Sequence, residues 1–136
     1  MMSRATPVER GPLALVPTRG VSGDRRVELS GPADHAFVRL ARTVTVSIAS
    51  QAGFGVDPCD ELRIAVDESC NILIHAGAED LSMEFVDDGE DLVVDIRSSL
   101  NERPHLVPTA QLVLATMVDE LDVAHGGRIV LHKRIG

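Results

Sequence analysis

The spacing of hydrophobic residues predicts a helix over residues 32 to 50. Apolar side chains recur there at intervals of three and four, which gives a helix one core-facing side. These residues are Phe37, Leu40, Ala41, Val44 and Ile48. We expect Gly31-Pro32 to start the helix, with Asp34 near its positive end, and Gly53 to stop it near Ser50.

A second helix is predicted directly after the first. Asp57 is placed to cap it, Pro58 suits its first position, and Gly77 should end it. Residues 62 to 76 are mostly apolar. This pattern predicts a buried helix, because no broad polar side is left for solvent.

Short alternating or apolar runs predict five strands around these helices. The strands cover residues 26–30, 81–86, 91–98, 121–124 and 128–134. The pair Asp88-Gly89 favours a hairpin between the second and third of them. A third helix should run from Pro108 to about Glu120. This order predicts a two-layer α/β sandwich, in which about three helices cover one face of a mixed, mostly antiparallel sheet.

The chain of 136 residues has the length of one folded domain. Residues 1–25 contain prolines and arginines but no sustained period, so we expect a flexible arm before a domain of residues 26–136. Hydrophobic residues make up 44% of the chain, yet no run of about 18 apolar residues is present to span a membrane. The arm also lacks the apolar core of a secretory signal. We therefore expect a cytoplasmic protein.

Charge is unevenly distributed along the chain, whose net charge is −8. Residues 1–26 contain five arginines and two acidic residues, so they carry +3 and the remainder carries −11. Direct nucleic-acid binding is not expected of this acidic domain, because phosphate contacts need clustered lysine and arginine. Aromatic residues for stacking bases are also scarce, at 2%. The acidity suits a basic protein partner, or it serves only to keep the protein soluble.

Polar side chains within the second apolar segment form the candidate site. Glu68, Asn71 and His75 are three and four residues apart, so a helix places them on one face. Asp67 lies four residues before Asn71. Polar groups in a buried helix need partners, and an acid beside an amide could hold a nucleotide, a metal or another protein chain. For His75 the alternative is a histidine that caps a carbonyl near the helix end.

The sequence predicts no dedicated metal site. Cys59 and Cys70 fall in one helical segment, where a rise of about 1.5 Å per residue separates them too far for a disulfide. We expect both thiols in or near the core. The histidines show no spacing typical of metal ligands, and the acidic cluster at residues 87–90 does not match a calcium-binding loop.

Residues 62–76 resemble the helix that carries a Glu-x-x-x-Asn signature in the GHKL ATPase superfamily, specifically in its anti-sigma-factor serine kinase branch. Residues 112–123 and 126–134 look like the last helix and closing strand pair of that family, so the resemblance covers roughly residues 27 to 136. It implies that the sandwich is of the histidine-kinase-like ATPase (Bergerat) type. In that family the glutamate polarises the attacking hydroxyl, the asparagine binds Mg²⁺ on the nucleotide phosphates, and two glycine-rich boxes hold adenine and form a lid.

The signature fits this chain in two registers. Matching the upstream residues makes Glu68 the family glutamate and places Ile72 at the asparagine position. Matching the downstream residues uses Asn71 as the asparagine and Asp67 as the acid. One residue rotates a helix by about 100°, so the two registers point different groups into the pocket. We favour Glu68 as the catalytic residue, with Asn71 and Asp67 as the residues nearest a nucleotide.

The glycine-rich boxes of the family are missing. Ser98-Ser99-Leu100-Asn101-Glu102 stands where an Asp-x-Gly-x-Gly box would follow the strand, and no glycine lies between Gly89 and Gly126. A phosphate cradle needs glycines so that the backbone can approach the ligand. Residues 97–107 are also short for a nucleotide lid. We therefore expect weak or no binding of Mg-ATP and no resident cofactor.

The resemblance implies two functions. The first is an anti-sigma factor that sequesters an alternative sigma factor and is released when an antagonist, a STAS domain protein, competes for it. The alternative is an active serine/threonine protein kinase that phosphorylates this antagonist. A degenerate sensor-kinase module is a third reading, although the chain has no dimerisation helix or phosphoacceptor segment to accompany one. A homodimer is also implied.

Overall fold

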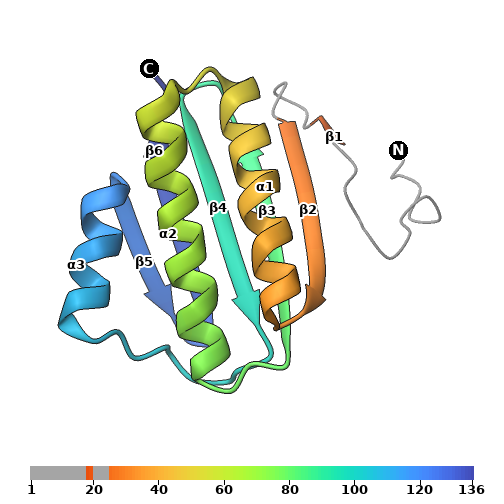
Figure 1. Cartoon of the computed structure of the whole chain (residues 1–136), viewed down its shortest axis with the longest axis vertical. Helices are drawn as coiled ribbons and strands as arrows, with labels where there is room; N and C mark the ends of the chain where they lie inside the picture. The colour runs from red at the N-terminus through yellow and green to blue at the C-terminus, as the bar shows by residue number, and fades with distance from the viewer. Residues whose placement is uncertain (1–17, 20–24) are drawn as a thin grey trace.

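The computed structural model describes residues 18–19 and 25–136 of the chain. Six strands form one sheet in the order β1-β2-β3-β4-β6-β5, and three helices cover one of its faces (Figure 1). The strands are β1 (Thr18–Arg19), β2 (Arg25–Pro32), β3 (Asp80–Asp87), β4 (Asp91–Ser98), β5 (Glu120–Ala124) and β6 (Arg128–Arg134). The helices are α1 (His35–Ala52), α2 (Val56–His75) and α3 (Pro108–Met117). The two-layer α/β sandwich is confirmed, and the described strands pair only in antiparallel fashion.

The core lies between the helices and the sheet. Every second residue of β4 points into it, so Leu92, Val94 and Ile96 are fully buried. Leu62 and Leu73 of α2 pack on the same layer at helical spacing. Aliphatic packing between the apolar side of α2 and the sheet therefore sets the position of α2 relative to the sheet. This helix carries the candidate site.

The start of α1 differs from the sequence prediction. Gly31-Pro32 ends β2 instead of opening the helix, because these residues pair with Leu81 and Asp80 of β3. The helix begins at His35, and the Asp34 carboxylate caps it by accepting a hydrogen bond of 2.9 Å from the Phe37 N–H.

The ends of the other helices also shift. Gly55, not Asp57, is the N-cap of α2, and Asp57 lies in the first turn, where its charge favours the positive helix end. The helix ends at His75, two residues before Gly77. Helix α3 ends at Met117, because Glu120 already belongs to β5 and pairs with β6.

The predicted arm contains a short strand. Thr18 and Arg19 form β1 and pair with Arg26 and Arg25 of β2. The other residues assigned to the arm, 1–17 and 20–24, lie outside the described part of the chain. Within the described part, no helix is long and apolar enough to cross a membrane.

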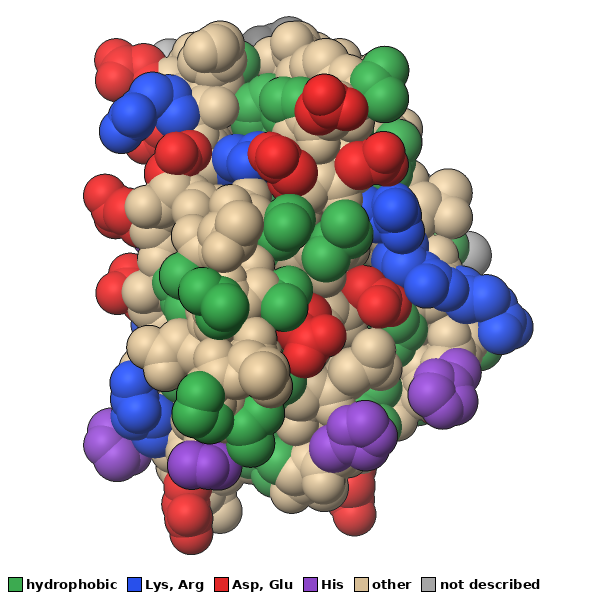
Figure 2. All heavy atoms as spheres, turned by 60° about the vertical axis from the view of Figure 1, so that its left-hand side comes forward, with side chains coloured by type: hydrophobic (Ala, Val, Ile, Leu, Met, Phe, Trp, Pro, Cys, Tyr) green, Lys and Arg blue, Asp and Glu red, His purple; other side chains and the backbone are tan. Residues whose placement is uncertain are grey.

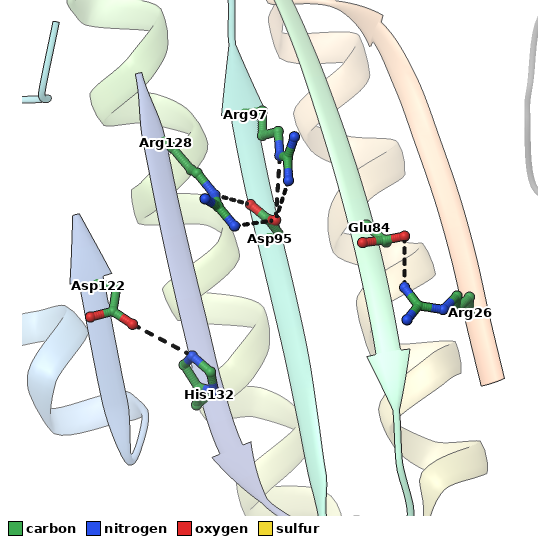
Figure 3. A network of polar contacts seen from close by, with 7 residues as sticks. All are labelled: Arg26, Glu84, Asp95, Arg97, Asp122, Arg128 and His132. Atoms are coloured by element: carbon green, nitrogen blue, oxygen red, sulfur yellow. Dashed lines mark hydrogen bonds and ion pairs between the residues drawn. The ribbon is translucent and has the colours of Figure 1, made fainter. Parts of the chain in front are cut away.

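The face of the sheet that no helix covers carries a network of ion pairs (Figure 3). The Asp95 side chain is only 9% exposed, and Arg128 and Arg97 contact its carboxylate at 2.9 and 3.1 Å. Arg26 and Glu84 form a second pair at 3.0 Å. These charged groups therefore compensate one another on this face.

Candidate functional site

Helix α2 is buried on one side only, which corrects the prediction of a buried helix. Its buried residues are Cys59, Leu62, Ala65, Val66, Ser69, Cys70 and Leu73. Asp67, Glu68 and Asn71 are half-buried, and His75 is exposed at the last helical residue. The helix packs against both neighbouring helices as well as the sheet. This packing accounts for its many apolar residues. Its polar residues therefore lie on its flanks and outer side.

The flank of α2 that faces α1 carries a small hollow. The hollow measures about 280 Å³ and is lined by His35, Val38, Arg39, Arg42, Asp67 and Asn71. Arg42 of α1 reaches the Asp67 carboxylate at 3.3 Å. Two predicted site residues, Asp67 and Asn71, are therefore brought together as the i, i+4 spacing required.

The opposite flank of α2 faces α3. The Lys133 side chain of β6 is only 10% exposed, and its Nζ contacts the Glu61 carboxylate at 3.0 Å. The same Nζ donates a hydrogen bond of 2.6 Å to the backbone carbonyl of Met117, at the end of α3. Glu68 lies two helical turns after Glu61, so it belongs to this flank. Its side chain makes no ion pair or hydrogen bond with another described residue.

The structure thus assigns the two acids of the alternative registers to different flanks. Asp67 and Asn71 share the hollow beside α1, and Glu68 is not among the residues that line it. The Asp67 carboxylate is also neutralised by Arg42, which makes it a poor ligand for a divalent cation. Among the described residues, no group of three or more histidine, cysteine or acidic side chains could hold a metal ion. Which acid serves a reaction stays a prediction.

The segment between β4 and α3 is fastened to the turn between β5 and β6. The N–H groups of Gly126 and Gly127 donate to the carbonyls of Asn101 and Glu102 at 3.0 and 2.9 Å. The Ser98 hydroxyl donates to the Gly127 carbonyl at 2.8 Å. Three hydrogen bonds therefore hold the residues that stand where the family has a glycine-rich box.

Gly127 is required for this attachment. Its φ is +59°, and a Cβ there would overlap both the Ser98 hydroxyl and the Leu100 side chain. Leu100 and Leu106 also pack against the core, and Pro104 is buried. The segment is thus packed and bonded as a fixed part of the fold.

A basic surface on the outer side of α1 and α2 was not anticipated. Arg39, Arg42 and Arg63 line a second hollow of about 460 Å³ beside the first. Figure 2 shows basic side chains gathered along the side of the molecule where these helices lie. Arg42 and Arg63 contact Asp67 and Asp60, whereas the Arg39 guanidinium makes no bond with a described residue. The three-residue spacing of Arg39 and Arg42 on one helix could have indicated this basic surface from the sequence.

Both cysteines are buried and free, as predicted. Burial, followed by the nearby Asp67 charge, raises the pKa of the Cys70 thiol to about 12. Burial also raises the pKa of Cys59, with a smaller contribution from Asp60. Neither thiol is a nucleophile at neutral pH, because the reactive thiolate is disfavoured.

Known proteins resemble this chain over much of its length. The anti-sigma-F factor RsbW of Mycobacterium tuberculosis (strain ATCC 25618 / H37Rv) is 30% identical over 118 residues, which are 83% of this chain and 70% of that protein. The serine-protein kinase RsbW of Bacillus cereus (strain AH187) is 33% identical over 57 residues, which are 41% of this chain and 36% of that protein. No family model matches the chain. The similarity therefore extends over most of the chain in the first case and over less than half of it in the second.

Proposed function

The chain belongs to the RsbW family of anti-sigma factors and serine-protein kinases, and on this premise we propose that it binds and sequesters an alternative sigma factor. Release occurs by partner switching, when an anti-sigma factor antagonist with a STAS domain competes for the chain. We also propose that the chain forms a homodimer and does not bind nucleic acid directly. The acidic domain would speed encounter with a basic sigma factor.

One observation carries the preference for binding over catalysis. The segment after β4 is held to Gly126 and Gly127 by backbone hydrogen bonds and has no glycine of its own. These bonds engage carbonyls of the segment, so we rest the preference on the missing glycines and on the packing of Leu100 and Leu106 against the core, because a backbone that cradles phosphate needs close access to it. We therefore propose weak or no ATP binding.

The exposed side of α1 supports a protein-binding role. Arg39 is exposed beside two hollows, and its guanidinium is unpaired among the described residues. Arginine is favoured in protein interfaces because it offers several donors in a planar fork. Because this surface is basic, we place on it the contact with an acidic part of the partner.

Co-purification tests the proposal. The tagged chain should retain one of the sigma factors expressed in the same cells at a fixed stoichiometry. Arg39→Ala should weaken that complex about tenfold or more, which is typical of a central interface arginine. Arg134→Ala, an exposed arginine at the end of β6, serves as the matched control. Failure to bind any sigma factor from these cells would remove the proposal, and sedimentation of the free chain tests the homodimer.

An active kinase is the second candidate. Glu68 is half-buried with an unpaired carboxylate, and the Bacillus relatives carry the name serine-protein kinase. In this version Glu68 is the general base and Asn71 a ligand of the metal in Mg-ATP. Addition of Mg-ATP at millimolar concentration should leave the melting temperature unchanged under our preferred proposal. A rise of several degrees, together with phosphorylation of the antagonist, would establish the kinase.

A further inference from the structure

Helix α3 lies at the outer end of the helical layer. Figure 1 shows it at the edge of the sandwich, where it contacts α2 and β5. Only Ala110 and Leu114 of its residues are buried. The other side of the helix therefore faces outward at this edge.

The outward side of α3 is apolar and uncharged. Residues 108–117 contain no charged side chain, although 25% of the chain is charged. Leu112 is 67% exposed, and Val107, the N-cap residue, is 50% exposed. Ala115 lies three residues after Leu112 and is exposed on the same side. Figure 2 turns this edge toward the reader and shows hydrophobic side chains exposed on it. Exposed apolar area of this kind is typical of a contact surface.

The charge of the domain favours a second copy of the chain at this surface. Residues 27–136 carry a net charge of −11, so two copies repel each other over most of their surfaces. Contact through α3 brings no charged helix residue into the interface, and a charged partner would find no opposite charge on this helix. A two-fold axis uses the same patch on both copies. Leu112 beside the small Ala115 offers the uneven surface that two copies of one helix can interlock.

The ends of α3 carry opposite charges. Arg103 and His105 precede the helix and are exposed, whereas Asp119 and Glu120 follow it and are exposed. Antiparallel packing of two α3 helices brings the basic end of one copy to the acidic end of the other, at both ends of the contact. It also sets the two helix dipoles in opposite directions. Parallel packing would instead place like charges together.

We propose that α3 is the homodimer surface, on which a second copy of the chain packs its own α3 in antiparallel orientation around Leu112. This inference rests on the homodimer proposed above and gives its location. One helix pair buries less area than a standard protein interface, so the dimer forms at about micromolar concentration.

Sedimentation of the full chain at tens of micromolar tests this surface. Leu112→Glu should raise the dissociation constant about a hundredfold, because two like charges then meet at the centre of the contact. Val56→Glu is the matched control, since it adds the same charge at an even more exposed aliphatic residue, 79% exposed at the start of α2. Both positions are exposed, so neither variant should lose its fold, which circular dichroism checks.

The outcomes separate the surface from the homodimer itself. A monomeric original chain would remove the homodimer and this surface together. A dimer that persists in Leu112→Glu, or that is weakened equally in Val56→Glu, would leave the homodimer standing and overturn its placement on α3.

Disulfide formation gives a readout that adds no charge. Leu112→Cys should form a disulfide between two copies under mild oxidation, because the residue lies near the two-fold axis. Val56→Cys should give only a trace, although its greater exposure in the free chain makes random collision more frequent. The native thiols are buried and should not compete. Equal yields from the two variants, or no disulfide in Leu112→Cys, would overturn the proposal.

Charge reversal tests the antiparallel orientation. Glu120→Lys should weaken the dimer several-fold, because the new lysine meets Arg103 of the other copy. Glu90→Lys, in the turn between β3 and β4, changes the net charge equally and should not weaken the dimer. A dimer that Glu120→Lys leaves unchanged or strengthens would overturn the antiparallel arrangement.

Discussion

The two flanks of α2 use neighbouring acids in different ways. Toward α1, Asp67 forms a half-exposed ion pair with Arg42 beside an open hollow. Toward α3, Glu61 holds the nearly buried Lys133, and Glu68 on the same flank is left unpaired. Adjacent positions of one helix therefore differ in partner and in exposure, because one residue turns the helix by about 100°.

This difference shows what a spacing motif conveys. The i, i+4 pair of Asp67 and Asn71 does share a surface, as its spacing required. The neighbouring helix then decides whether that surface is a free pocket or is occupied by an arginine. An acid and an amide at helical spacing therefore identify a flank without identifying its chemistry.

The largest expected effect is on the flank that faces α3. Lys133→Ala removes the contact with Glu61 and leaves the Met117 carbonyl without its donor. We expect a loss of about 2 kcal/mol in the free energy of unfolding, measured by urea titration, because the buried side-chain stem of Lys133 is lost and a part-buried acceptor is left without its donor. Glu61 is 44% exposed and can turn to water, which limits the cost. Lys133→Met keeps most of the packing and should cost less.

If neither Lys133 variant shifted the urea midpoint, the contrast between the two flanks would fail. Equal losses in both variants would assign the effect to the polar contacts and not to the buried aliphatic stem.

The acid sensitivity of the protein tests how a buried charge affects stability on the uncovered face of the sheet, away from both flanks of α2. Burial alone would raise the pKa of Asp95, but hydrogen bonds and charge from Arg128, and then from Arg97, outweigh it and hold the pKa below its ordinary value of 3.8. A depressed pKa in the folded state stabilises the protein above pH 3.8, and this contribution is lost as the pH falls through the folded value. Asp95→Asn should therefore lower stability at neutral pH and flatten the loss below about pH 4.

The measurement is the urea midpoint of both proteins between neutral pH and acid. Parallel curves for the variant and the original chain would show that the Asp95 network contributes nothing to acid sensitivity.

The flank that faces α1 should respond less. The side chains of Arg42 and Asp67 are 35% and 32% exposed, so water and salt screen their attraction. A double-mutant cycle with Arg42→Ala and Asp67→Ala should give a coupling of about 0.5 kcal/mol, falling further in high salt. A coupling as large as the Lys133 effect would erase the distinction between the flanks.

Local patterns were sufficient for most of the fold. The Asp88-Gly89 turn and the alternation in β4 predicted the central hairpin, and helical spacing predicted α1 and α2. The errors arose where distant residues decide the conformation. Gly31-Pro32 was expected to open α1, but pairing with β3, about 50 residues away, keeps it in β2.

The candidate site was predictable only in part. The sequence identified Asp67, Glu68 and Asn71 as the polar residues of α2, and it could not say which flank meets which helix. The partners are remote, since Lys133 lies 72 residues from Glu61. The spacing of hydrophobic residues along the sequence does not indicate such a contact. The attachment of the β4–α3 segment to Gly126 and Gly127 is likewise tertiary.

The smallest expected effect on stability is at Glu68. Glu68→Gln removes a charge that contacts no described partner, so the free energy of unfolding should change by less than about 0.5 kcal/mol. Asp67→Asn is the matched control on the other flank, because it loses the contact with Arg42. If the chain acts only by binding, Glu68→Gln also leaves retention of the sigma factor unchanged. Loss of antagonist phosphorylation in Glu68→Gln, with phosphorylation intact in Asp67→Asn, would instead make Glu68 the general base and decide between the two registers.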